Sequence, residues 1–211
     1  KNYLIFGGTS GIGLCLVKEL LKSKNNLTLI IRNIDKAKLL FNDEVKLIEV
    51  DLEDSSILLE TLNKIDINSK FDGLIYTAGI EGTFPLKSAS HEKLIKYYNI
   101  NTISFHLALS FFSKKKISND SSSIVVISSI MSTIGDSGKS VYSASKSSLN
   151  GLVRSAALEL SSRKIRVNAI SPGLTLTDMG NALLDRMSNL DQDQLLKEYP
   201  LGFGKSEYVS D

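Results

Sequence analysis

Six short apolar segments recur along the chain, separated by stretches whose apolar residues have helical spacing. Each segment is rich in β-branched side chains, which indicates a strand, and its unbroken apolarity indicates burial on both faces. The segments cover residues 3–6, 27–31, 46–50, 73–77, 123–128 and 165–170. Because strand and helix alternate throughout, the pattern predicts an α/β fold with a parallel sheet covered on both faces.

The length of 211 residues suits one well-packed domain, and no repeat, low-complexity tract or Pro/Gly-rich linker divides the chain. Hydrophobic residues make up 42% and charged residues 23%, a balance typical of soluble globular proteins. The formal net charge of +2 is spread along the chain, and the densest basic cluster is only the triplet at 114–116. We therefore predict a single domain over residues 1–211 that binds neither nucleic acid nor membranes.

The single cysteine, Cys15, excludes an internal disulfide and suits a reducing compartment. The first apolar segment is too short for a signal peptide or a membrane span, so we expect a cytoplasmic protein. The only histidines, His91 and His106, have no carboxylate or cysteine in ligand spacing. We therefore expect no metal site.

A glycine-rich stretch, "GGTSGIG" at 7–13, follows the first apolar segment directly. Glycines in this GxxxGxG spacing permit a tight strand-to-helix turn and let backbone N–H groups approach a pyrophosphate at the helix N-terminus. The motif alone could serve only the turn, but its place in the first βα unit favours nucleotide binding. The predicted cofactor-binding residues of this loop are Gly7, Thr9, Ser10, Gly11, Ile12 and Gly13.

The second apolar segment ends at the position where a dinucleotide fold distinguishes a free ribose from a 2′-phosphate. Ile31 stands where an acidic residue would hold the 2′-hydroxyl, and Arg32 and Asn33 follow it. An arginine can hold a phosphate with its forked donors, so NADP(H) is favoured over NAD(H), although a plain surface arginine is the alternative. After the third segment, Asp51 is predicted to accept a hydrogen bond from the adenine and Leu52 to flank the ring.

Tyr142 and Lys146 stand four residues apart in "VYSASK" and therefore share one face of a helix. A nearby ammonium and a cationic nicotinamide favour the phenolate form, which lowers the tyrosine pKa and makes Tyr142 a usable acid or base. Ser129 precedes Tyr142 by thirteen residues and can supply a second hydrogen-bond donor to a carbonyl. The alternative for such a pair is ordinary packing of a tyrosine and a lysine on one helix.

Taken together, these motifs resemble the classical short-chain dehydrogenase/reductase family, and its 3-oxoacyl-carrier-protein reductases in particular, over essentially the whole chain. The likeness is carried by the glycine loop, Tyr-x-x-x-Lys, the serine before it, and three further stretches. These stretches are "NINTISF" with Asn101, "RVNAISPGLTLTDM" at 166–179 and "YPLGFGKSE" at 199–207. The resemblance implies a three-layer doubly wound sheet, Rossmann-like, with strand order 3-2-1-4-5-6 and a seventh strand beyond residue 211.

The resemblance also implies roles for individual residues. Tyr142 would donate a proton to the carbonyl oxygen, Ser129 would hold that oxygen, and Lys146 would lower the tyrosine pKa and bind the nicotinamide ribose. Asn101 would position a water that connects Lys146 to solvent. Ala78 and Gly79 would approach the adenine ribose through their backbones.

Pro172 and Gly173 end the sixth apolar segment, where the chain turns over the nicotinamide. The backbone of Leu174 would hold the carboxamide, and Thr177 would bond the carboxamide or the phosphates. A helix over about 178–197 would then form a lid on the substrate, the alternative being a surface helix with no ligand role.

Three positions depart from the family pattern. Phe6 stands where a threonine is usual, and Tyr76 and Thr77 stand where two asparagines are usual. Since both amides tie neighbouring strands together, their loss bears on stability and cofactor affinity more than on reaction type.

We expect an oxidoreductase that transfers hydride between NADP(H) and a carbonyl or secondary alcohol, with a 3-oxoacyl thioester or a similar ketone as substrate. The alternative is a non-catalytic dinucleotide-binding sensor or scaffold. Small residues on one face of the Tyr142 helix also predict a homodimer or homotetramer. They are Ala144, Ser148, Gly151 and Ser155.

Overall fold

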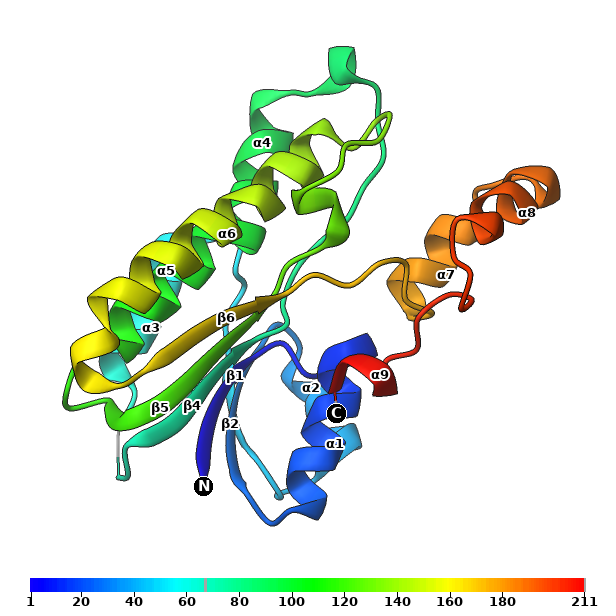
Figure 1. The fold of residues 1–211 in the computed structure, drawn as a ribbon. Coiled ribbons are helices and arrows are strands. Elements are labelled where there is room, and N and C mark those ends of the chain that lie inside the picture. The colour runs from blue at the N-terminus through cyan, green and yellow to red at the C-terminus, as the bar shows by residue number, and fades with distance from the viewer. Residues whose placement is uncertain (67, 211) are drawn as a thin grey trace.

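The computed structural model describes residues 1–66 and 68–210, and a six-stranded parallel sheet forms its centre (Figure 1). The strand order is β3-β2-β1-β4-β5-β6, which confirms the predicted order of a doubly wound fold. The strands are β1 (Asn2–Phe6), β2 (Asn26–Ile31), β3 (Lys46–Glu49), β4 (Phe71–Tyr76), β5 (Ser118–Ile127) and β6 (Arg166–Ile170). The seventh strand predicted beyond residue 211 lies outside the described residues and stays a prediction.

Helices cover both faces of this sheet (Figure 1). One face carries α1 (Gly11–Lys22) and α2 (Ile34–Phe41), with the short α9 (Glu207–Ser210) against α1. The other face carries α3 (Ser55–Lys64), α5 (Ser104–Phe112) and α6 (Ser140–Glu159), and α4 (His91–Tyr98) precedes α5. A π-helix, Asn99–Ile103, joins α4 to α5, and short 3-10 turns occupy Leu86–Ser88, Ile130–Ser132 and Ser161–Arg163. None of the helices in the described part of the chain is long and apolar enough to cross a membrane.

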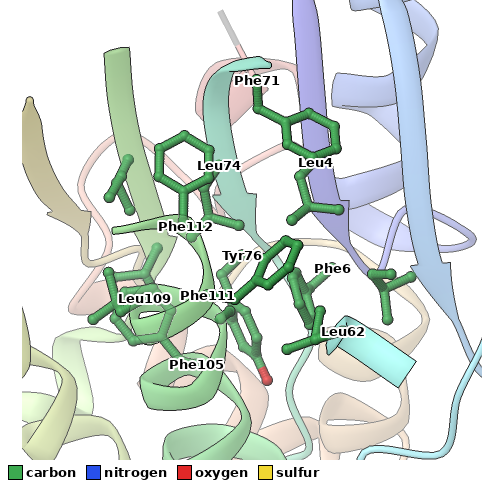
Figure 2. Packing of buried hydrophobic residues seen from close by; sticks show 14 of the residues in the cluster. Leu4, Phe6, Leu62, Phe71, Leu74, Tyr76, Phe105, Leu109, Phe111 and Phe112 are labelled. Carbon is green, nitrogen blue, oxygen red and sulfur yellow. The ribbon is translucent and has the colours of Figure 1, made fainter. Parts of the chain in front are cut away.

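The larger part of the core lies between the sheet and the α3, α5 and α6 layer (Figure 2). Tyr76 of β4 stands at its centre, fully buried, with its ring stacked on Phe6 at a centroid distance of 5.2 Å and tilted against Phe105 at 5.2 Å. Aromatic pairs of this geometry add about 0.5–1.5 kcal/mol beyond their buried area. Phe6 and Tyr76, both departures from the family pattern, therefore pack on each other.

The chain beyond β6 differs from the expectation of one helix over 178–197. It forms two helices, α7 (Asp178–Leu184) and α8 (Asn189–Lys197), which lie apart from the sheet (Figure 1). The hydroxyl of Ser188 accepts a hydrogen bond from the backbone N–H of Asp191, so α8 begins with an N-cap of its own. The prediction of a single helix was wrong because this capping serine was read as part of a continuous helical pattern.

Candidate functional site

A cavity of about 480 Å³ lies at the carboxyl ends of the central strands. The glycine loop after β1 forms one wall, with Gly7, Gly8 and Gly11 at φ of 93°, 105° and 49°. A Cβ on Gly13 would stand 2.9 Å from the backbone nitrogen of Gly8, which is closer than real Cβ atoms approach. The loop therefore needs glycine both for its left-handed turn and for the close approach of α1 to the turn.

Tyr142 and Lys146 face the same cavity from α6, and Ser129 faces it from the end of β5. All three side chains are buried. The Ser129 hydroxyl accepts a hydrogen bond of 3.2 Å from the backbone of Met131, which fixes the serine at the start of a 3-10 turn. The structure thus brings together the three residues that the sequence predicts to act on a carbonyl.

Burial dominates the electrostatics of Tyr142 and Lys146 in this structure. Burial raises the pKa of Tyr142, a hydrogen bond with Ser129 opposes that shift, and the Glu81 carboxylate adds to it. Burial also lowers the pKa of Lys146 to about 8. The Nζ of Lys146 donates to the carbonyl of Ile127 at 2.9 Å. The lowering of the tyrosine pKa expected from the ammonium together with a cationic nicotinamide stays a prediction.

Asn101 lies inside the π-helix and is fully buried. Its side-chain oxygen accepts from the backbone N–H of Ile80 at 2.9 Å, and its amide donates to the Ile80 carbonyl at 3.0 Å and to the Ser145 hydroxyl at 2.9 Å. A Cβ on Gly79 would lie 3.1 Å from Lys146 Nζ and 3.3 Å from Asn101 Oδ1. Gly79 is thus the point at which Asn101 and Lys146 converge.

Tyr76 of β4 is hydrogen-bonded to the π-helix. Its hydroxyl donates to the carbonyl of Ile100 at 2.6 Å and contacts the hydroxyl of Ser104, which bonds the same carbonyl at 2.8 Å. Two side-chain hydroxyls thus bond one backbone carbonyl of the π-helix. Thr77, the other departure from the family, donates to the Phe6 carbonyl at 2.9 Å and so ties β4 to β1.

Residues after β6 close the cavity on the remaining side. The lining includes the four residues that the sequence predicts at the nicotinamide end, Pro172, Gly173, Leu174 and Thr177. The backbone N–H of Leu174 donates to the hydroxyl of Tyr199 at 3.0 Å, so this predicted carboxamide ligand already has a partner within the chain. The hydroxyl of Thr177 caps α7 by accepting from the N–H of Gly180.

Four predicted cofactor residues lie outside this cavity lining, at the ends of β2 and β3. Arg32 is exposed, and the Asn33 side chain caps α2 by accepting from Lys36. Asp51 accepts from the backbone of Glu53 at 3.0 Å, and Leu52 is buried. The assignment of these four residues to the cofactor remains a prediction.

The lining also holds residues that the sequence reasoning missed. Glu81 and Lys139 form a buried ion pair beside Tyr142, and Tyr199 covers Gly173. The position of Lys139 three residues before Tyr142, and of Glu81 two residues after Gly79, was the available signal. Within residues 1–66 and 68–210, His, Cys, Asp and Glu side chains nowhere gather in threes suited to a metal.

Comparison with known proteins agrees with this geometry. Residues 1–188 match the family described as short chain dehydrogenase. Carbonyl reductase family member 4 of Xenopus laevis is 32% identical over 100% of this chain and 88% of its own length. The 3-oxoacyl-[acyl-carrier-protein] reductase of Homo sapiens is 30% identical over 100% of this chain and 88% of its own.

Solved structures show the same likeness. A short chain dehydrogenase family protein from Francisella tularensis has a TM-score of 0.86 at 26% identity, covering 99% of this chain and 87% of that one. ElxO with NADP bound has a TM-score of 0.84 at 26% identity, covering 100% and 88%. The chain is thus an oxidoreductase with a doubly wound dinucleotide fold. It belongs to the short-chain dehydrogenase/reductase family, whose members act on carbonyl or alcohol groups.

Proposed function

We propose that the protein is an NADP(H)-dependent reductase of ketones, with 3-oxoacyl thioesters among the candidates. The observation that carries this is the convergence of Ser129, Tyr142 and Lys146 on one buried cavity whose opposite wall is a glycine turn. The relatives named 3-oxoacyl-[acyl-carrier-protein] reductase and carbonyl reductase support the substrate class. No finding favours the alternative of a non-catalytic sensor.

The residues present fit a dinucleotide. The turn at Gly7, Gly8 and Gly11 is left-handed, and a Cβ on Gly13 would have no room. The turn thus leads directly into the N-terminus of α1 beside the cavity, where backbone N–H groups would suit a pyrophosphate. Residues of the loop, with Ala78, Gly79 and the 172–177 segment, would hold the cofactor, with Arg32 and Asn33 at a 2′-phosphate and Asp51 and Leu52 at the adenine. When bound, NADPH supplies the hydride.

The chain itself moves the proton. Tyr142 donates its hydroxyl proton to the carbonyl oxygen of the substrate, and the Ser129 hydroxyl donates a hydrogen bond to the same oxygen. The Lys146 ammonium stabilises the phenolate that remains on Tyr142. Asn101, next to Lys146 across Gly79, positions a water through which the proton is replaced.

The test is the loss of NADPH absorbance with a panel of ketones that includes a 3-oxoacyl thioester. Tyr142→Phe should reduce kcat by about 10²–10⁴-fold, the range of general acid catalysis. Turnover that survives in the variant contradicts the mechanism, and cofactor binding with turnover of none of the ketones favours the sensor.

Cofactor choice has a separate test. Arg32→Asp should raise the Kd of NADPH much more than that of NADH, because only NADPH carries the phosphate that the guanidinium would hold. Equal effects on both cofactors would remove Arg32 from the site.

The covering of the substrate is part of the same proposal. The α7 and α8 segment contributes Met179, Leu183, Met187 and Leu195 to the cavity, which gives the substrate side an apolar wall.

We further propose a single cytoplasmic domain that forms a homodimer or homotetramer through α6, where Ala144 and Ser155 are exposed. Light scattering of the purified protein tests the assembly, and a monomer at micromolar concentration contradicts it.

A further inference from the structure

Two buried charges at the substrate side of the cavity have no part in the mechanism above. Glu81 follows β4 in the loop after Gly79, and Lys139 directly precedes α6. Their side chains are 12% and 6% exposed, form an ion pair with each other, and line the cavity. Of the other charged lining residues, Asp136 is exposed, Asp178 begins α7, and Lys146 is already assigned.

Burying an ion pair in the wall of a cavity costs desolvation free energy. The desolvation of two charges offsets most of their attraction, and well-packed apolar side chains of similar volume are often as stabilising or more so. The neighbouring lining residues Ile80 and Met131 show that apolar side chains suit this wall. A pair that adds little to stability and faces a binding cavity points to recognition of a ligand.

The pair also has hydrogen-bonding capacity to spare. The Lys139 ammonium has three donors, and among the described residues Glu81 is its one hydrogen-bond partner. The Lys139 ammonium and the Thr83 hydroxyl both donate to Oε1 of Glu81, and no described residue donates to its Oε2. The pair therefore offers a ligand at least one donor and one acceptor side by side.

Its position relative to Tyr142 defines which part of a substrate it would meet. Lys139 Nζ lies 6.0 Å from the centroid of the Tyr142 ring, and the Glu81 carboxylate is close enough to act on that phenol electrostatically. If the substrate carbonyl accepts from the Tyr142 hydroxyl, a substituent on the carbon next to it would come within reach of the pair. The other substituent would then lie toward the apolar side chains that α7 and α8 contribute to the same cavity.

We propose that Glu81 and Lys139 bind a hydroxyl group adjacent to the reacting carbonyl, so that the preferred substrates are α-hydroxy ketones and, in the reverse direction, vicinal diols. A hydroxyl both accepts from the ammonium and donates to the carboxylate. A carboxylate in its place would meet the negative charge of Glu81 as well as Lys139, and an alkyl group would leave the spare donor of Lys139 and Oε2 of Glu81 without a partner. This inference rests on the proposed function and names the substrate class of the same site.

The test compares three ketones that differ in one group. They are 1-hydroxybutan-2-one, pentan-3-one, in which a methyl replaces the hydroxyl, and 2-oxobutanoate, in which a carboxylate replaces the hydroxymethyl group. We expect kcat/KM for the hydroxy ketone to exceed both others by about tenfold or more, because a site built for a hydroxyl rejects analogues that lack it.

The variant Glu81→Met with Lys139→Met removes both charges together, so that neither is left alone in the cavity. It should bring the ratio of kcat/KM between 1-hydroxybutan-2-one and pentan-3-one close to one. The more conservative Glu81→Gln with Lys139→Gln keeps a donor and an acceptor, should retain part of the preference, and serves if the first variant fails to fold. The matched control is Glu60→Met with Lys64→Met, an exposed ion pair on α3, which should keep the wild-type ratio.

Each failure has its own meaning. Equal kcat/KM for 1-hydroxybutan-2-one and pentan-3-one in the wild type overturns this inference and leaves the reductase intact. Preference for 2-oxobutanoate also overturns it, because it makes Lys139 an anion site. Turnover of neither these three ketones nor the wider panel overturns the proposed function itself.

Discussion

The Nζ atom of Lys146 donates a hydrogen bond of 2.9 Å to the carbonyl oxygen of Ile127, the last residue of β5. The ammonium is thereby anchored to the sheet edge between Asn101 and Tyr142, at the point where Gly79 leaves room for it. A charge held there is costly to bury, and its loss at high pH has consequences for both activity and stability.

The activity should depend on the ionisation of this lysine. Burial lowers the pKa of Lys146 to about 8, so the ammonium that stabilises the Tyr142 phenolate is lost as pH rises through about 8. We expect kcat/KM for ketone reduction to fall above that pH, approaching tenfold per pH unit. Lys146→Arg, whose charge persists to higher pH, should shift this limb upward even if it is slower throughout. A flat profile between about pH 7 and 9.5 would contradict this assignment.

The free energy of unfolding should rise as Lys146 loses its proton, whereas the activity should fall. Because the folded-state pKa is below that of the unfolded chain, the unfolded state binds more protons between about pH 8 and 10.5. The penalty for the buried charge is therefore fully present below pH 8 and disappears above 10.5. The shift in the Lys146 pKa corresponds to about 3 kcal/mol of lost stability at neutral pH. Replacing Lys146 would remove this penalty but would also remove the hydrogen bond to Ile127, which contributes about 1 kcal/mol.

Lys146→Met should thus be at least as resistant to urea as the wild type at pH 7, although it is inactive. The difference should shrink or reverse when unfolding is measured at pH 10. Lys64→Met, at an exposed position, is the control and should change the free energy of unfolding by less than about 0.5 kcal/mol at either pH. Strong destabilisation of Lys146→Met at pH 7 would show that the hydrogen bond outweighs the desolvation.

Tyr76→Phe removes the hydroxyl that satisfies the Ile100 carbonyl within the π-helix. Since Ser104 still bonds that carbonyl, we expect a loss of about 1–2 kcal/mol in the free energy of unfolding. Asn101 is the next residue, so kcat should fall as well, while the Kd of NADPH stays near its wild-type value. Tyr208→Phe, at a side chain that is 70% exposed, provides the comparison and should alter neither quantity.

Gly13→Ala tests the close packing of the glycine turn. The added methyl would stand 2.5 Å from Thr77 Oγ1 and 2.9 Å from the Gly8 nitrogen, so the turn or α1 must move. We expect lower stability and weaker NADPH binding, measured by thermal unfolding and by fluorescence titration. Gly135→Ala, where nothing lies within 4 Å of the added methyl, is the control and should change the free energy of unfolding by less than about 0.5 kcal/mol. A Gly13→Ala protein that binds NADPH normally would remove the turn from the cofactor site.

Local patterns in the sequence were enough to predict the sheet and to predict that Ser129, Tyr142 and Lys146 share one site. Strand runs, a glycine turn and a four-residue helical spacing are all properties of neighbouring residues, and the parallel order follows from them with the family resemblance. The burial that raises the pKa of Tyr142 in this structure could not be predicted in this way, because it depends on packing in three dimensions rather than on neighbouring residues.

Contacts between distant residues could not be predicted in the same way. The Tyr76 hydroxyl meets Ile100 at a separation of 24 residues, and Glu81 meets Lys139 at 58. Each pair depends on tertiary packing: the first on how the π-helix lies against β4, and the second on how the loop after β4 approaches the residues before α6. The split between α7 and α8 depended on a single capping serine, Ser188, which a helical period does not reveal.

The strand order places β1 and β4 side by side at the centre, so the sheet consists of an N-terminal half, β3-β2-β1, and a later half, β4-β5-β6. The cavity takes its glycine turn from the first half and Ser129, Tyr142 and Pro172 from the second. A dinucleotide in this cavity therefore contacts both halves of the sheet at once. At a concentration of about 100 times its Kd it adds about 2.7 kcal/mol to the free energy of unfolding.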